Sequence, residues 1–204
     1  MSIMQQNGAA IIAMVGKDCV GIASDLRLSA HGQLLAADFP KVFQVSDTIF
    51  VGLPGLATDM QTMLNIVKFR MSLYELREER PMPAKVLSHL FSHLLYERRF
   101  APYFVEPLVI ALEEDGKPFL SSSDFVGATG FVDDFMVGGS CSPNLNSMCE
   151  SLYRPGLEPD DLFEVLAQCM MNATDRHAKV GNGAVVHIIT KDGVTTRVAK
   201  GRQD

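Results

Sequence analysis

The first 55 residues alternate short apolar runs with polar breaks, a pattern typical of β-strands joined by turns. The first two apolar runs cover residues 9–14 and 20–23, and the polar break between them contains Gly16. A glycine in such a break favours a tight reversal of the chain. We therefore expect these two runs to form a β-hairpin.

A second pair of apolar runs, at residues 42–45 and 49–53, flanks a polar break that begins at Ser46. The same reasoning predicts a second hairpin there. Between the two hairpins, residues 29–33 are expected to form a turn and residues 34–37 a short strand.

The spacing of apolar residues changes after this region. Over residues 58–80 and 84–100, apolar side chains recur every three or four positions, which predicts two long helices. Thr58 or Asp59 is expected to cap the first helix, because short polar side chains accept hydrogen bonds from the free N–H groups at a helix start.

The remainder of the chain repeats this order of strands and helices. The pattern predicts strands at 106–113, 117–123 and 131–138, helices at 142–152 and 158–179, and a closing hairpin at 184–190 and 194–199. Groups of strands between pairs of helices favour antiparallel sheets with helices stacked outside them, rather than β-α-β units. We therefore assign the α+β class and one domain over residues 1–204.

The composition narrows the class of protein further. The chain has 204 residues and a net charge of −6 without any Lys/Arg run, so nucleic acid is not an expected partner. Its first residues do not have the pattern of a signal peptide, and no apolar run approaches the ~18 residues of a membrane span. These features favour the cytoplasm and nucleus and predict no membrane partner. Cysteines without metal-type spacing are expected to be buried free thiols: Cys19, Cys141, Cys149 and Cys169.

Three charged residues stand at the ends of apolar runs. Asp25 and Arg27 are two residues apart, so on a continuous strand both side chains would point to the same face. Lys41 lies at the start of a later apolar run. We expect the three to form a charged cluster inside the fold.

This order of motifs resembles the proteasome β-subunit family of N-terminal-nucleophile hydrolases. In that family a hairpin leads to a strand that ends in Asp-x-Arg, a lysine follows at the next strand, and Gly-x-x-x-Asp opens the first long helix. Here these features are Asp25, Arg27, Lys41 and the segment from Gly55 to Asp59. The resemblance implies a four-layer αββα sandwich, two antiparallel sheets flanked by helix pairs, over nearly the whole chain.

Counted in register with these motifs, the catalytic threonine of the family falls on Ala9. The family's reaction uses the threonine hydroxyl as nucleophile, its own α-amine as base, a lysine that tunes the pair, and a backbone N–H after a glycine turn that stabilises the oxyanion. Asp25, Arg27, Lys41 and Gly55 match the supporting residues, but alanine has no hydroxyl.

Other positions of the constellation also differ. The resemblance places Gly139 where the family has a serine, and it places His177 and Val180 where the family's Arg-Asp-Ala-x-Ser-Gly motif has its Asp and Ser. We therefore expect no catalytic residue in this chain, only vestiges of a site. The charged cluster is then expected to serve folding, because the lysine has nothing to activate.

The resemblance implies a non-enzymatic, structural role in a threonine-type endopeptidase complex. The implied complex is the 20S proteasome core particle, which acts in ATP- and ubiquitin-dependent protein degradation. Implied partners are other β subunits in a heteroheptameric ring, with beta-2 and beta-4 as neighbours, the α-ring subunits and the opposite β ring. No cofactor is implied. Residues 1–8 are expected to remain on the mature chain, because their self-removal needs the missing hydroxyl.

Two other functions stay open on the residues alone. Ser2 could act as an N-terminal nucleophile of a self-processing hydrolase, although it lies seven residues ahead of Ala9. The chain could also be a free-standing binding module that uses the vacant pocket. His89 and His93 have helical metal-ligand spacing, but no third ligand is evident, so no metal site is expected.

Asp124 is the last candidate. It follows strand-forming residues just before a glycine turn, where a carboxylate often accepts hydrogen bonds from turn N–H groups. The resemblance also implies a second role, because the corresponding acid lines the substrate pocket of the adjacent trypsin-like beta-2 subunit. One residue could do both.

Overall fold

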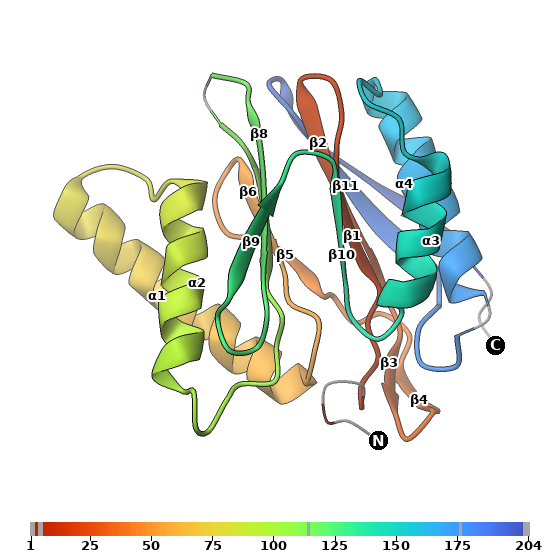
Figure 1. The fold of residues 1–204 in the computed structure, drawn as a ribbon, viewed down its shortest axis with the longest axis horizontal. Coiled ribbons are helices and arrows are strands. Elements are labelled where there is room, and N and C mark those ends of the chain that lie inside the picture. The colour runs from red at the N-terminus through yellow and green to blue at the C-terminus, as the bar shows by residue number, and fades with distance from the viewer. Residues whose placement is uncertain (1–2, 4–5, 114, 176, 202–204) are drawn as a thin grey trace.

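The computed structural model describes residue 3 and residues 6–113, 115–175 and 177–201. Two five-stranded antiparallel sheets form its centre (Figure 1). The first sheet has the strand order β10-β1-β2-β11-β12. Its strands are β1 (Ile11–Val15), β2 (Cys19–Asp25), β10 (Phe135–Gly138), β11 (Ala184–Thr190) and β12 (Gly193–Ala199).

The second sheet has the strand order β5-β6-β7-β8-β9, and a separate two-stranded ribbon pairs β3 with β4. The strands of the second sheet are β5 (Val42–Gln44), β6 (Ile49–Gly52), β7 (Leu108–Leu112), β8 (Pro118–Ser123) and β9 (Thr129–Val132). The ribbon is made of β3 (Leu28–Ala30) and β4 (Gln33–Ala36). The antiparallel pairs β1–β2, β5–β6 and β11–β12 confirm the two hairpins predicted near the N-terminus and the closing hairpin predicted near the C-terminus.

A pair of helices covers the outer face of each sheet, so four layers follow one another across the molecule in Figure 1. Helices α1 (Ala57–Glu78) and α2 (Ala84–Glu97) lie beside the second sheet. Helices α3 (Ser142–Leu152) and α4 (Pro159–Thr174) lie beside the first. The α+β class and the αββα layering are confirmed. No helix in the described part of the chain is long and apolar enough to cross a membrane.

The period of two along β1 explains why the sheets need cover on both faces. Ala10, Ile12 and Met14 pack into the cluster shared with α3 and α4. Ile11 and Ala13, which alternate with them, pack into the cluster between the two sheets. A strand that is apolar on both faces is stable only when both faces are buried, which is the arrangement that the four layers supply.

One predicted strand was wrong. Residues 131–138 were expected to form a single strand, but β9 pairs with β8 in the second sheet and β10 pairs with β1 in the first. The chain crosses between sheets at Asp133 and Asp134. There the Asp134 carbonyl accepts a hydrogen bond from the Val15 N–H at 2.8 Å, which ties the crossing to the first hairpin.

Helix and turn boundaries also differ from the expectation. Helix α1 begins after Leu56 without a side-chain cap, so neither Thr58 nor Asp59 caps it. Asp59 instead accepts a hydrogen bond from the Phe104 N–H at 2.9 Å. Helix α4 ends at Thr174 and α2 at Glu97, both earlier than expected. The turn expected at 29–33 is shorter, because Ser29 pairs within the β3–β4 ribbon.

Candidate functional site

Lys41 and Asp25 form a buried ion pair where the two sheets meet. The Lys41 Nζ lies 2.6 Å from Asp25 Oδ1, and the two side chains are 3% and 0% exposed. Asp25 ends β2 of the first sheet, and Lys41 immediately precedes β5 of the second. Burial lowers the pKa of Lys41, while the Asp25 carboxylate acts in the opposite direction. The pair therefore joins the two central layers at one end of the sandwich.

The Asp25 carboxylate also organises the backbone around it. Its Oδ1 accepts a hydrogen bond from the Ala10 N–H at 2.9 Å, and its Oδ2 accepts one from the Gly181 N–H at 3.3 Å. A buried carboxylate needs such donors, because leaving its oxygens without partners carries a large desolvation penalty. Asp25 thus connects the start of β1, the lysine and the loop that follows α4.

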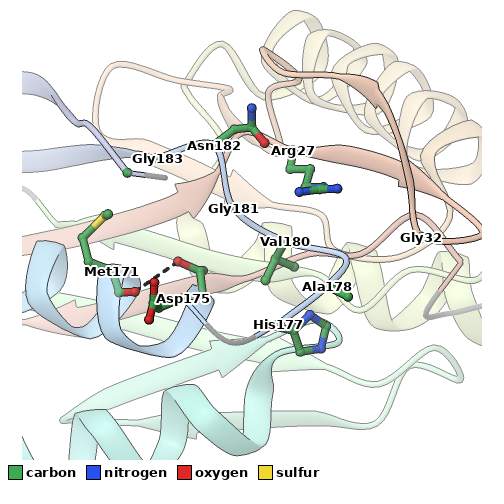
Figure 2. Close-up of a pocket in the computed structure, with 12 residues that line it drawn as sticks. Arg27, Gly32, Met171, Asp175, His177, Ala178, Val180, Gly181, Asn182 and Gly183 are labelled. Carbon is green, nitrogen blue, oxygen red and sulfur yellow. Dashed lines mark hydrogen bonds between the residues drawn. The ribbon is translucent and has the colours of Figure 1, made fainter. Parts of the chain in front are cut away.

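Arg27 takes part in this cluster differently from the expectation. Strand β2 ends at Asp25, so Arg27 does not continue the same strand face. Its backbone carbonyl accepts a hydrogen bond from Lys41 Nζ at 2.7 Å. Its side chain lines the adjacent cavity shown in Figure 2. The charged cluster exists around Asp25 and Lys41, with Arg27 contributing main-chain oxygen to it.

Ala9 lies buried at the end of this cluster, and its side chain carries no nucleophilic atom. Its N–H donates a hydrogen bond to Ser140 Oγ at 3.2 Å, and its carbonyl accepts one from the Cys141 N–H at 3.3 Å. The serine that contacts position 9 is therefore Ser140, which the sequence reasoning did not identify. Gly139 has φ +97°, and an added Cβ would come within 2.3 Å of the Ala9 carbonyl oxygen. A serine at position 139 would be strained and crowded there.

The space around Ala9 is almost filled. The cavity bounded by Ala9, Lys41 and Gly55 has a volume of about 10 Å³, which is roughly the room of one water molecule. Gly55 is held by an isolated bridge to Val105. This cavity therefore has no room for an entering substrate peptide.

Asn7 and Gly8 close this cavity from the N-terminal side. The Asn7 Nδ2 donates to the Ser29 carbonyl at 3.0 Å, and its Oδ1 accepts from the Ala57 N–H at 3.0 Å. A Cβ added to Gly8 would lie 2.3 Å from the Lys179 carbonyl oxygen, so only glycine fits this close approach. The segment before Ala9 is anchored across the site. Ser2, the alternative nucleophile, lies outside the described residues.

The loop after α4 borders the site on its other side. Val180 is buried, and His177 is half-buried with its pKa lowered, mainly because burial disfavours the charged imidazole. Both residues line a cavity of about 490 Å³ together with Arg27 and Asn182, and Figure 2 shows these side chains arranged around it. Arg176, which begins the altered motif, lies outside the described residues. Neither His177 nor Val180 supplies a carboxylate or hydroxyl toward Ala9.

Asp124 caps the turn that it enters. Its Oδ1 accepts hydrogen bonds from the Val126 N–H at 2.9 Å and the Ala128 N–H at 2.8 Å. The side chain is exposed. Its charge also helps to raise the pKa of Glu106, for which burial is the larger cause. The turn-capping role needs only this chain, whereas a role in a substrate pocket would need a second chain.

One of the two histidines of α2 lies against an aromatic ring. His89 packs edge-on against Phe131, with ring centroids 6.2 Å apart. Among the described residues, no group of three or more His, Cys, Asp or Glu side chains is placed to hold a metal ion. The four cysteines are buried and free, as expected.

Known proteins are similar in sequence to this chain over their whole length. The family model described as proteasome subunit matches residues 5–189. Proteasome subunit beta type-3 of Dictyostelium discoideum is 50% identical over 205 residues, and its counterpart in Drosophila melanogaster is 48% identical over 205 residues. The probable proteasome subunit beta type-3 of Schizosaccharomyces pombe is 48% identical over 204 residues. Each alignment covers 100% of both chains.

Proposed function

This chain belongs to the proteasome subunit family, and from that premise we propose that it is a non-catalytic structural subunit of the 20S core particle. The structural role is supported by the similarity of this chain, over its full length, to relatives named proteasome subunit beta type-3. The non-catalytic part rests on the site itself. Position 9 has no nucleophile, and the space beside it holds about one water.

The proposed role is to complete the β ring. A closed ring of different subunits needs every heterologous interface filled, so a subunit without chemistry still determines whether the particle forms. We propose as partners the other β subunits, with beta-2 and beta-4 on either side, the α-ring subunits and the opposite β ring. The particle would act in ubiquitin-dependent protein degradation in the cytoplasm and nucleus.

The native size of the chain tests this role. A tagged copy expressed in its own cells should sediment entirely with a particle far larger than one 22.3 kDa chain, together with other proteasome subunits. Sedimentation as a monomer or as a small homo-oligomer would reject the proposal. It would favour the free-standing binding module instead.

We also propose that Asp124 lines the substrate pocket of the adjacent beta-2 subunit. Its Oδ1 is used by the turn, but the side chain is exposed, and a carboxylate there would attract basic substrate side chains. In assembled particles, Asp124→Asn should weaken cleavage after basic residues by about tenfold or less and leave chymotrypsin-like cleavage unchanged.

The Asp124→Asn variant distinguishes a role in the pocket from a role in the turn, because its amide oxygen can still accept both turn hydrogen bonds while the negative charge is lost. Asp124→Ala, which removes these bonds, serves as the comparison. If both peptidase activities fall together in Asp124→Asn, the residue serves folding or assembly. If neither changes, the pocket role is wrong.

A further inference from the structure

The outer helix layer carries a groove with an apolar floor and a cationic rim. It lies between the middle of α1 and the C-terminal end of α2 and has a volume of about 470 Å³. We call it the arginine-rimmed groove. The residues that define it are Ile66, Phe69, Arg70, Leu94, Arg98 and Tyr103.

The groove combines a buried apolar base with an exposed aromatic side chain on its wall. Leu94 is buried at its base, whereas Phe69 on its wall is 62% exposed. Two residues after Arg98, which lines the groove, Phe100 is 97% exposed in the turn that follows α2. Contiguous exposed aromatic and aliphatic side chains mark interaction surfaces, and aromatic residues and arginine are enriched among those that contribute most to binding.

The charges around the groove are mostly positive. Lys68, Arg70, Arg98 and Arg99 are exposed, and no ion pair joins any of them to another described residue. Glu97 is the only acid among the residues that line it.

Some exposed cations elsewhere in the described part of the chain do have carboxylate partners. For example, Lys17 lies 2.7 Å from Glu158, and Arg197 lies 2.8 Å from Asp160. The groove is thus a locally positive surface on a chain whose net charge is −6.

We propose that the arginine-rimmed groove binds an acidic segment of a neighbouring proteasome subunit. That segment places an aliphatic or aromatic side chain against Phe69 and carboxylates beside Arg70 and Arg98, where a guanidinium can bind a carboxylate through two hydrogen bonds. The inference rests on the proposed function, because it needs an assembled particle. A nucleic acid is disfavoured by the net charge, and a second copy of this chain is an outcome of the test.

Photo-crosslinking in the assembled particle identifies the occupant. Phe69 is replaced by the photoreactive residue p-benzoyl-phenylalanine, the purified particle is irradiated, and the crosslinked peptide is sequenced by mass spectrometry. The same replacement at Val198, which is 61% exposed on β12, is the matched control. The expected crosslink from position 69 reaches another subunit, within about five residues of at least two Asp or Glu.

Charge reversal tests the arginines directly. Arg70→Glu combined with Arg98→Glu should lower incorporation into particles about tenfold in competition with the wild-type chain. Lys85→Glu combined with Arg154→Glu makes the same change of net charge at exposed positions away from the groove and should incorporate like wild type. Replacing both groove arginines by lysine should retain most of the incorporation, because the charge is kept.

The outcomes separate this inference from the function on which it rests. If the wild-type chain does not enter a large particle, the proposed function fails and the inference fails with it. If the wild type assembles but position 69 crosslinks to no subunit, to a second copy of this chain or to a segment without acids, only the inference is overturned. Equal incorporation of the groove and control variants also overturns it.

Discussion

Asp25 is the residue on which the local structure of the site depends most. Its two carboxylate oxygens accept hydrogen bonds from Lys41, from the Ala10 N–H and from the Gly181 N–H. These donors come from three separate parts of the chain. A carboxylate that is fully buried and multiply bonded keeps its place without any catalytic use, because removing it leaves the remaining partners unsatisfied.

Asp25→Ala should therefore destabilise the chain strongly. It leaves the buried Lys41 charge without its partner, and breaking one side of a buried pair typically costs about 3–5 kcal/mol. The free energy of unfolding in urea measures this. Glu158→Ala, which breaks the exposed pair with Lys17, is the control and should cost far less, because solvent screens an exposed pair. The expectation fails if the two variants lose similar stability, and Asp25→Leu with Lys41→Met should recover part of the loss.

For single residues, the sequence predicted which side chains lie near one another better than it predicted which atoms form hydrogen bonds. The register placed Ala9, Asp25 and Lys41 near one another. In the structure Asp25 and Lys41 form an ion pair, and Ala9 lines the same small cavity as Lys41. The hydroxyl at the Ala9 amide comes from Ser140, because the positive φ of Gly139 turns the chain and presents the next side chain. A one-residue offset of this kind depends on backbone conformation, which a motif does not specify.

At the scale of elements, the start of α1 shows how distant residues complete a helix. Leu56 occupies the cap position and offers no side-chain acceptor. The Ala57 N–H instead donates to Asn7 Oδ1, from a segment 50 residues earlier in the chain. A free N–H group at a helix start needs an acceptor, and a local polar residue is not the only possible source.

Asn7→Ala should consequently weaken the fold by about 1–2 kcal/mol, because it removes the acceptor at α1 and the donor to the Ser29 carbonyl. Asn65→Ala provides the control, since Asn65 is exposed on α1 and alanine favours a helix. Unfolding in urea compares the two. Equal stability of both variants would show that the Asn7 contacts contribute nothing.

The sequence could not divide residues 131–138 between two sheets, because apolar spacing is the same in both strands and the division depends on partners far away in the chain. Strand β9 pairs with β8 and β10 with β1. The adjacent acids Asp133 and Asp134 were the available signal for a break between strands. The end of α4 at Thr174 lacked a strong local signal and is set by tertiary contacts of the following loop, such as the Gly181 N–H on Asp25.

The contact between the two sheets contains a titratable side chain. His187 on β11 packs its ring against Phe50 of β6, with centroids 5.1 Å apart, and its Nδ1 lies 2.9 Å from Thr196 Oγ1. Burial lowers the pKa of His187 below its ordinary value of 6.5. The unfolded chain therefore binds this proton first as the pH falls. The stability that the neutral imidazole supplies is fully present above pH 6.5 and is lost as the pH falls toward the lowered pKa.

His187→Gln should make the melting temperature less sensitive to acid, because glutamine does not titrate and can keep a hydrogen bond to Thr196. Melting curves between about pH 8 and about pH 5 measure the slope. His177, whose pKa is lowered by burial as well, retains its share of the pH dependence, so the slope should decrease without disappearing. An unchanged slope would contradict the role of His187.

At the scale of the whole molecule, the four layers and the filled site both make the fold a scaffold. Apolar clusters fill the space between the sheets and beneath both helix layers, and the Asp25–Lys41 pair closes one end of the sandwich. A scaffold of this kind presents fixed outer surfaces to its neighbours. The assignment of a single domain over residues 1–204 stays a prediction that one cooperative unfolding transition would support.

Ala9→Thr tests whether the lost hydroxyl is the only obstacle to chemistry. We expect the variant to remain inactive toward peptides, because Asn7 and Gly8 line the cavity of about 10 Å³ beside position 9 and leave no room for a substrate carbonyl. We also expect it to keep residues 1–8. In addition, Asn7 anchors the segment ahead of position 9, and His177 and Val180 supply no carboxylate or hydroxyl for a free amine. Intact-mass analysis of the variant chain shows whether residues 1–8 are retained. Repeating it after treatment with a peptide epoxyketone, which reacts with N-terminal threonine, shows whether the site is active. A chain shortened to position 9, or one that gains the mass of the inhibitor, would show that the substitution at Ala9 alone accounts for the absence of activity.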